Sequence, residues 1–164
     1  MPGQNEIEKK LIALTELAPA GWALALHVHF TAATFILQTY PREWRDYYTK
    51  NGLVMRDPIV KWGFETRGHE YWSVLAEDDP GGVLQAAADH GMGYGVVTSV
   101  GNDDTFSIGG FARNDRPYTT EEANALEAAT LEIHDLTNNL KQLSPETAEA
   151  MRRLAIEYTH PSSA

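Results

Sequence analysis

Residues 40–72 read YPREWRDYYTKNGLVMRDPIVKWGFETRGHEYW, and this stretch carries the strongest structural signals of the chain. Tyr40, Trp44 and Tyr48 are spaced by four residues, so a helix that begins at the first proline aligns their side chains on one side. Asp57 stands directly before a second proline, which is typical of a helix N-cap followed by proline at the first helical position. The stretch therefore predicts two short helices, one with an aromatic face and one capped by a carboxylate.

The segments before this stretch predict one helix and two strands. Residues 5–18 place apolar side chains every three or four positions, as an amphipathic helix does. Residues 22–30 alternate with a period of two, which predicts a strand, and residues 34–40 are rich in β-branched and aromatic residues, which predicts a second one. On the first strand we expect a bulky face of Trp22, Leu24, Leu26, Val28 and Phe30 opposite a slimmer face of Ala23, Ala25, His27 and His29.

The segments after it predict a helix and then a β-hairpin. Asp79 and the proline that follows signal a helix that runs to about residue 90. Residues 94–100 and 105–112 are apolar and β-prone, and the turn sequence GNDD joins them as in a hairpin.

Two more helices are predicted toward the C-terminus. Thr119 and Glu122 have capping-box spacing, and the helix that they open is expected to continue to residue 143. The sequence SPE at 144–146 indicates the start of a last helix. Helices at both ends with antiparallel strands between them predict an α+β fold, a central sheet flanked by helices.

The composition is that of one globular domain. The chain has 164 residues, 43% of them hydrophobic, which is enough for one core with an enclosed pocket. Cysteine is absent, so disulfides, thiol catalysis and cysteine metal sites are excluded. No apolar run approaches the roughly 20 residues that span a bilayer, and the N-terminus lacks the basic and apolar regions of a signal peptide. We therefore expect a cytoplasmic protein with no membrane partner.

The net charge of −10, from 23 acidic and 13 basic residues, bears on binding to negatively charged partners such as nucleic acids. Nucleic-acid binding relies on Lys and Arg to neutralise phosphates, so a surface this acidic should repel a duplex. Direct nucleic-acid binding by this chain is not expected.

The aromatic stretch has two interpretations. Tyr40, Trp44, Tyr48 and Trp72 could be a stripe packed into the core, with Asp57 only capping its helix. Alternatively they line a pocket, because Tyr and Trp combine an apolar body with a polar tip and can enclose an apolar ligand while fixing its head. An aspartate in such a site can accept a hydrogen bond from a ligand amide N–H.

The order of motifs favours the pocket. The run Tyr40-Pro41-x-x-Trp44-x-x-x-Tyr48, followed by Asp57-Pro58-Ile59-Val60, then Trp72, then Gly91-x-x-x-Gly95, resembles the autoinducer-binding domain of LuxR-type quorum-sensing regulators over roughly residues 5–142. This resemblance implies an α/β/α sandwich, similar to GAF and PAS domains, with an antiparallel sheet and an enclosed pocket for one N-acyl-homoserine lactone.

The resemblance also implies roles for individual residues. Trp44 would donate its indole N–H to the lactone carbonyl, Tyr40 would donate to the acyl carbonyl, and Asp57 would accept the amide N–H. Tyr48 and Trp72 would wall the head group, and an Asp57 left unpaired would make the protein unstable without ligand. The implied ligand-binding set is Tyr40, Trp44, Tyr48, Asp57, Ile59, Val60, Trp72, Ala87, Met92, Gly95, Ser107 and Gly110, with no catalytic residue, no metal ligand and no cofactor.

The sequence departs from the family pattern at several positions. Ser99 stands where a proline is frequent, and Gly110 stands where Ser or Thr often contacts the 3-substituent of the acyl chain, a role that Ser107 could take. Gly109 and Gly110 leave room, which favours a medium to long acyl chain.

The chain also ends without the helix-turn-helix that follows this domain in LuxR-type regulators. We expect residues 1–143 to form the autoinducer-binding domain and residues 144–164 a C-terminal helix and tail, which is either the start of a DNA-binding domain or part of a naturally truncated regulator.

A heptad pattern on the long helix raises the question of a partner chain. The apolar residues that recur every seven positions are Leu126, Ile133 and Leu140 in one row and Ala129, Leu136 and Leu143 in another. The rows either pack on the sheet or pair two chains, as a homodimer or as a heterodimer that blocks a full-length relative.

Other functions find less support. His27 and His29 could share a strand face as metal ligands do, but no third ligand stands at a clear spacing. An enzyme acting on lactones or amides would need a nucleophile or a metal-bound water, which the predicted site does not offer. A GAF- or PAS-like sensor for an unrelated apolar ligand remains a third alternative.

Overall fold

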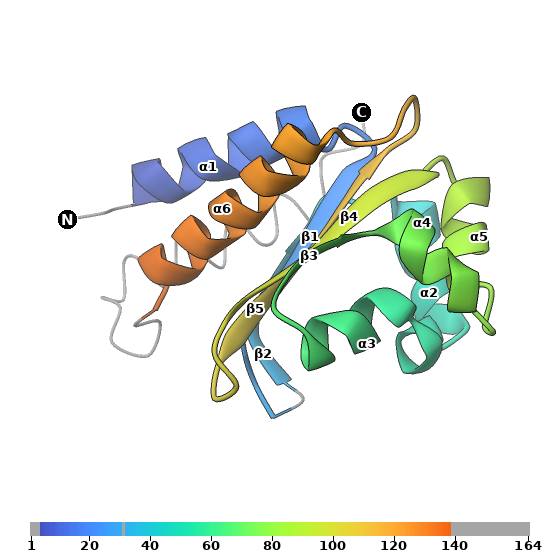
Figure 1. Cartoon of the computed structure of the whole chain (residues 1–164), viewed down its shortest axis with the longest axis horizontal. Coiled ribbons are helices and arrows are strands. Elements are labelled where there is room, and N and C mark those ends of the chain that lie inside the picture. The colour runs from blue at the N-terminus through green and yellow to red at the C-terminus, as the bar shows by residue number, and fades with distance from the viewer. Residues whose placement is uncertain (1–3, 31, 139–164) are drawn as a thin grey trace.

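A five-stranded antiparallel sheet in the order β2-β1-β5-β4-β3 organises the chain (Figure 1). The computed structural model describes residues 4–30 and 32–138. The strands are β1 (Gly21–His29), β2 (Ala32–Gln38), β3 (Gly68–Tyr71), β4 (Tyr94–Gly101) and β5 (Phe106–Arg113). The α-helices are α1 (Gln4–Leu17), α2 (Arg42–Lys50), α3 (Pro58–Glu65), α4 (Trp72–Leu75), α5 (Val83–Asp89) and α6 (Thr120–Leu136), with short 3-10 helices η1 (Leu53–Arg56) and η2 (Ala76–Asp78).

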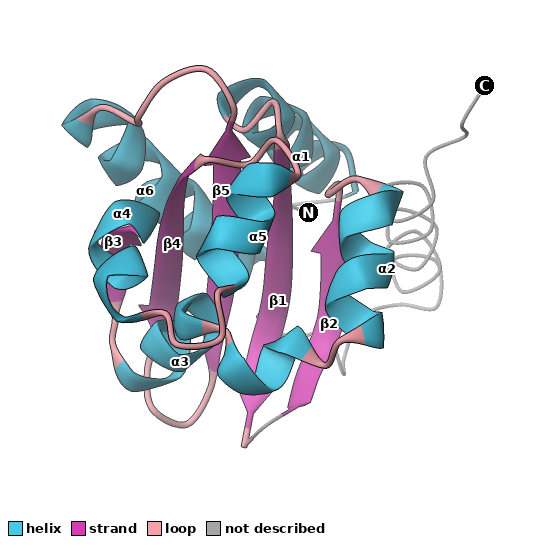
Figure 2. Cartoon of the chain, turned by 90° about the vertical axis from the view of Figure 1, so that its right-hand side faces the viewer, coloured by secondary structure: helices cyan, strands magenta, loops and turns pink. Residues whose placement is uncertain are grey.

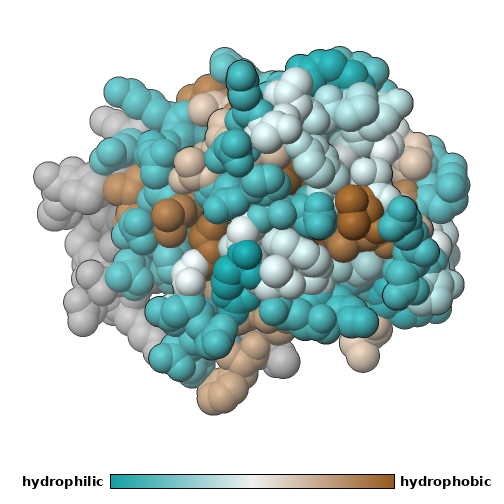
Figure 3. Space-filling view, in the orientation of Figure 1, coloured by the Kyte–Doolittle hydropathy of each residue, from teal (hydrophilic) through white to brown (hydrophobic). Residues whose placement is uncertain are grey.

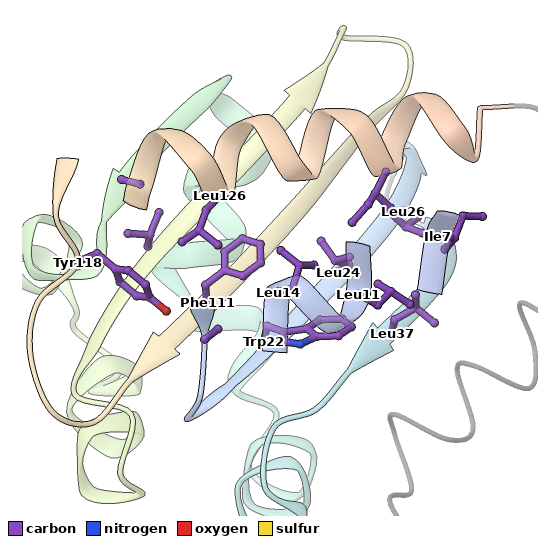
Figure 4. Packing of buried hydrophobic residues seen from close by; sticks show 14 residues of the cluster. Ile7, Leu11, Leu14, Trp22, Leu24, Leu26, Leu37, Phe111, Tyr118 and Leu126 are labelled. Carbon is purple, nitrogen blue, oxygen red and sulfur yellow. The ribbon is translucent and has the colours of Figure 1, made fainter. Parts of the chain in front are cut away.

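The helices form one layer on each face of the sheet. Helices α1 and α6 lie side by side on one face, while α2, α3, α4 and α5 cover the other (Figures 1 and 2). Each face has its own apolar core. Figure 4 shows the core on the α1–α6 side, where Leu11 and Leu14 of α1 and Leu126 of α6 meet Trp22 and Phe111 of the sheet. The predicted α+β sandwich with a helix-flanked antiparallel sheet is confirmed.

A β-bulge interrupts the alternation of β1. Ala25 pairs with Ile108 of β5, but Val28 pairs with Phe106, so β1 holds one extra residue between these pairs. His27 lies in the bulge with φ +53°, a left-handed conformation in which His is over-represented. The bulge turns His27 toward α6 and Val28 toward the α2–α5 layer.

The expected faces of this strand are therefore only partly right. Trp22, Leu24 and Leu26 do share the fully buried face, whereas Val28 joins the opposite core and Phe30 is 84% exposed.

Several predicted ends shift in the structure. Helix α5 begins at Val83, later than the Asp79-Pro signal indicates, because the Asp79 carboxylate reaches forward from a loop and accepts hydrogen bonds from the Val83 and Leu84 N–H groups. Helix α6 ends at Leu136 and not at residue 143. The hydroxyl of its C-cap residue Thr137 donates a hydrogen bond to the Ile133 carbonyl. The capping box of Thr119 at the other end of α6 is present as predicted.

One heptad row of α6 is buried under the helix. Leu126 and Ile133 lie fully buried in the α1–α6 core, so they are not free to pair with another chain, whereas Ala129 and Leu136 of the other row pack against the same core and are only partly buried. Leu140, Leu143 and the predicted last helix lie outside the described residues. Figure 3 shows that hydrophobic residues surface on the viewed face only in small groups among hydrophilic ones. Within the described residues, every helix is too short or too polar to cross a bilayer.

Candidate ligand-binding site

A cavity of about 420 Å³ lies between the sheet and the α2–α5 layer. Its size falls within the range of small-molecule sites. The polar groups in its wall come from the end of β2 and Tyr40 just beyond it, from α2, from the N-cap of α3 and from Trp72 of α4. Nine of the twelve residues that the sequence predicts line this cavity: Tyr40, Trp44, Tyr48, Asp57, Ile59, Val60, Trp72, Ala87 and Gly110.

Asp57 is held as the N-cap of α3. One carboxylate oxygen accepts the Ile59 N–H at 2.9 Å, and the other accepts the Tyr48 hydroxyl at 2.8 Å. The side chain is buried, and burial raises the pKa of the Asp57 carboxyl, an effect that the hydrogen bonds from Tyr48, Ile59 and Val60 oppose. The expectation that Asp57 is unpaired without ligand is therefore wrong. Because a carboxylate has about four acceptor positions, it retains capacity for one more donor.

The aromatic residues cluster around this carboxylate. Trp44 is buried and its ring centroid lies 5.7 Å from that of Tyr48, one turn later on α2. Tyr40 lies under Gly110 of β5, where a Cβ would stand only 2.8 Å from the Tyr40 hydroxyl oxygen. Gly110 thus leaves room for that hydroxyl. Burial raises the pKa of Tyr40, with the charge of Asp57 adding to the effect, so the phenol is a donor at neutral pH.

Three aromatic donors of the cavity wall have no hydrogen-bond partner within the described residues. They are the indole N–H of Trp72, which is fully buried, and the Tyr40 hydroxyl and Trp44 indole N–H. A buried polar group without a partner costs free energy, so such donors mark positions where a ligand acceptor is favourable.

Gly95 of β4 does not line the cavity, although it was predicted in the wall. It lies behind Trp72, and any Cβ at this position would overlap the Trp72 indole ring. Gly95 therefore lets the Trp72 ring lie flat on β4, with its far side toward the cavity. Gly95 thus affects the site by setting where the Trp72 ring lies.

Ser107 and Met92 also lie away from the cavity. The Ser107 hydroxyl is on the α6 face of β5, where it accepts the His27 backbone N–H at 3.0 Å and contacts Nδ1 of His134 at 2.6 Å. It therefore cannot reach a ligand on the other face. Met92 is buried in the same core as the cavity wall, and it faces a second, more polar hollow between α4 and α5.

The floor of the cavity is made of residues outside the set that the sequence predicts. Ala23, Ala25 and Val28 of β1 and Ala33 and Ile36 of β2 all line it. The alternation of β1 did place the first two on the slimmer face, but the bulge that adds Val28 has no signal in residue type beyond the His at its centre. The exposed wall residues Thr49 and Val54 had no sequence signal at all.

The histidines that suggested a metal site have separate partners. His27 Nε2 lies 3.0 Å from the His134 carbonyl oxygen and 3.0 Å from the Thr137 hydroxyl oxygen, while His29 Nδ1 lies 2.9 Å from the Asp104 carbonyl oxygen. Within residues 4–30 and 32–138 no three His, Asp or Glu side chains gather as metal ligands would.

Comparison with solved structures shows the same fold. The N-acylhomoserine lactone dependent LuxR family transcription factor CepR2 from Burkholderia cenocepacia superposes with a TM-score of 0.63 at 22% identity, over 94% of this chain and 89% of that one. SdiA from Escherichia coli superposes with a TM-score of 0.67 at 19% identity, over 88% of this chain and 66% of that one. A structure of SdiA in complex with octanoyl-rac-glycerol gives a TM-score of 0.66.

Sequence comparison gives nearer relatives. The transcriptional activator protein SolR of Ralstonia nicotianae is 29% identical over 126 residues, and that of Ralstonia solanacearum is 30% identical over 122 residues. The matches cover 73% and 70% of this chain but only 53% and 52% of the relatives, so the chain spans about half the length of the curated relatives that it matches. Both relatives are transcriptional activators.

Among known protein families, the autoinducer binding domain matches residues 22–136, from the first residues of β1 to the end of α6. This segment contains the sheet, the cavity and every polar group of its wall. The chain therefore belongs to the autoinducer-binding domain family of LuxR-type quorum-sensing transcriptional regulators.

Proposed function

We propose that this chain is a receptor domain that binds one N-acyl-homoserine lactone, of medium to long acyl chain, in the cavity between the sheet and the α2–α5 layer. The observation that carries the proposal is the pairing of polar groups. Such a lactone presents two carbonyl acceptors and one amide donor, and the wall offers aromatic donors without a partner among the described residues on Tyr40, Trp44 and Trp72, beside the Asp57 carboxylate as an acceptor. The rest of the wall is mainly apolar, as an acyl chain requires.

The proposed pose assigns one contact each to Trp44, Tyr40 and Asp57. Trp44 donates to the lactone carbonyl, Tyr40 donates to the acyl carbonyl, and Asp57 accepts the amide N–H. Tyr48 keeps the Asp57 carboxylate oriented through its 2.8 Å hydrogen bond and closes the head-group end together with Trp72. Ile59, Val60 and Ala87 border the acyl chain.

Calorimetric titration with lactones of graded chain length tests this function. The wild type should bind at least one lactone, and Asp57→Ala and Trp44→Phe should each weaken binding by about 1–3 kcal/mol, the scale of one buried polar contact. Ser107→Ala, on the other face of the sheet, is the matched control and should leave the affinity unchanged. Equal affinity of wild type and both head-group variants would refute the assigned contacts.

A monoacylglycerol distinguishes the head group from the tail. Octanoyl-rac-glycerol has an ester carbonyl and hydroxyls but no amide N–H, and SdiA binds it. If the lactone is the ligand of this chain, octanoyl-rac-glycerol should bind more weakly than N-octanoyl-homoserine lactone. Asp57→Ala should reduce this difference in affinity, because Asp57 is proposed to bind the amide N–H that only the lactone has. Stronger binding of the glycerol lipid would point to a receptor for acylglycerols.

The proposed biological role is transcriptional control by a cytoplasmic regulator. The chain would act through a DNA-binding domain or a partner chain, with residues 1–143 as the sensor domain and residues 144–164 leading onward. Homodimerisation, or pairing with a full-length relative, belongs to the same proposal. It does not use Leu126 or Ile133, which pack on the sheet. Sedimentation of the protein with and without lactone measures the assembly.

A further inference from the structure

The wall of the cavity is closed on one side and open on the other. Toward β4, β5 and α5 it consists of buried side chains such as Val83, Ala87 and Ile108. Toward the edge strand β2 it includes Ile36, which is 57% exposed, and Val54 of η1, which is 51% exposed. Figure 2 shows β2 at the edge of the sheet with α2 beside it. Two apolar residues that both line the cavity and face solvent therefore border an opening between β2 and η1.

Small residues connect the polar end of the cavity to this opening. Ala23 and Ala25 of β1 and Ala33 of β2 line the floor with single methyl groups. Although β1 is hydrogen-bonded to a strand on each side, Ala23 and Ala25 are only partly buried, because the space above them is empty of protein atoms. A shallow apolar floor thus runs along the sheet beneath the cavity.

The register of the strands gives the direction of this floor. Tyr40, at the polar end, lies two residues after the end of β2, and Ile36 lies four residues before Tyr40, on β2 opposite Ala25. Four residues of strand span about 13 Å. A short acyl chain that is anchored at Tyr40 ends above the alanine floor, whereas a long one reaches Ile36 and Val54.

We propose that the opening between Ile36 and Val54 is the exit for the tail of a long acyl chain, so that these two side chains set how the receptor responds to chain length. The inference rests on the proposed function and deepens it, because it assigns the chain-length selectivity of the site to the edge of the sheet and not to its sealed end.

An open exit and a sealed pocket respond differently to a growing chain. Each methylene that is buried on binding strengthens affinity about fourfold. In an open site the affinity rises with chain length and then levels off, because the carbons beyond the opening stay in water. In a sealed site the affinity passes through a maximum and then falls steeply, because extra methylenes overpack the cavity.

The experiment is a calorimetric titration of the wild type with N-butanoyl-, N-hexanoyl-, N-dodecanoyl- and N-tetradecanoyl-homoserine lactone. The same series is measured on Ile36→Trp and Val54→Trp, each of which places a large ring at the opening. Met55→Trp is the matched control, because Met55 belongs to the same 3-10 helix and is 86% exposed but does not line the cavity.

The wild type should bind the two long-chain lactones with similar affinity, both more tightly than the short ones. Ile36→Trp and Val54→Trp should weaken the long-chain lactones about tenfold or more while leaving N-hexanoyl-homoserine lactone within about twofold, and Met55→Trp should resemble the wild type. A sharp fall in affinity from the N-dodecanoyl to the N-tetradecanoyl lactone would refute the exit. So would an equal loss of affinity for all chain lengths in both Ile36→Trp and Val54→Trp. Neither result would refute the receptor function. If the wild type binds no lactone of any length, the proposed function itself fails, and the exit with it.

Discussion

Gly95 offers the sharpest test of how the sheet positions the binding site. A Cβ at this position would overlap three atoms of the Trp72 indole, well inside the 3.0 Å that real Cβ contacts almost never cross. The indole is rigid and buried, so it cannot give way as a flexible chain end would. Gly95→Ala should therefore push Trp72 off β4 and destabilise the fold by about 1–3 kcal/mol, the usual cost of overpacking a core.

The displaced ring moves away from β4 and toward the cavity that it lines. We therefore expect lactone affinity to fall together with stability, although Gly95 itself does not contact the ligand. Urea denaturation measures the first effect and calorimetric titration the second. Gly93→Ala is the matched control, since the nearest atom to its added Cβ, on Ala88, lies at 4.0 Å.

A double-mutant cycle with Trp72→Leu isolates the contact. In that background the flat ring is gone, so Gly95→Ala should cost only a small part of what it costs in the wild type, which gives a coupling energy of about 1–3 kcal/mol. If Gly95→Ala is as destabilising without the indole as with it, the glycine has another role and the reasoning is refuted.

Three further predictions follow from the described contacts. Burial raises the pKa of the Asp57 carboxyl. As the pH is lowered, lactone affinity should therefore begin to fall while the pH is still above about 3.9, the ordinary pKa of an aspartate. An affinity that does not change with pH, or the same fall in Asp57→Asn, would show that Asp57 is not the titrating group. Burial lowers the pKa values of the stacked His27 and His134. Because the unfolded state then binds more protons than the folded state, the unfolding free energy should fall as the pH drops below about 6.5. In urea denaturation, His134→Gln should show a weaker dependence of stability on pH. Ser107→Ala should lower the unfolding free energy by about 1–3 kcal/mol, because it leaves a buried His134 nitrogen unpaired, and no change in urea denaturation would show that this contact is dispensable.

Local signals in the sequence were sufficient for much of the fold and for the polar end of the site. The Asp57 N-cap, the capping box of Thr119 and the spacing of Tyr40, Trp44 and Tyr48 each depend on neighbours within a few residues, and such features are legible in a single sequence. The glycine after α2 likewise adopts the left-handed conformation, with φ +58°, that ends the helix.

Features that depend on distant pairing could not be predicted in this way. The bulge at His27 exists because β1 carries one more residue than β5 between paired positions, and a strict period of two then assigns Val28 and Phe30 to the wrong face. Strand β3 was missed because its four residues, Gly68–Tyr71, become a strand only through pairing with β4. The role of Gly95 depends on an indole more than twenty residues earlier in the chain.

The two cores on opposite faces of the sheet separate two tasks within a single strand. Trp22 and Leu24 of β1 anchor the solid layer under α1 and α6, while Ala23 and Ala25, their immediate neighbours, form the floor of the cavity. Substitutions at the second pair can reshape the ligand space while the solid layer keeps its packing, and hence most of its stabilising contacts. Such an architecture is evolvable: a lineage can change the signal to which it responds, one alanine at a time, without first having to rebuild the scaffold that keeps it folded.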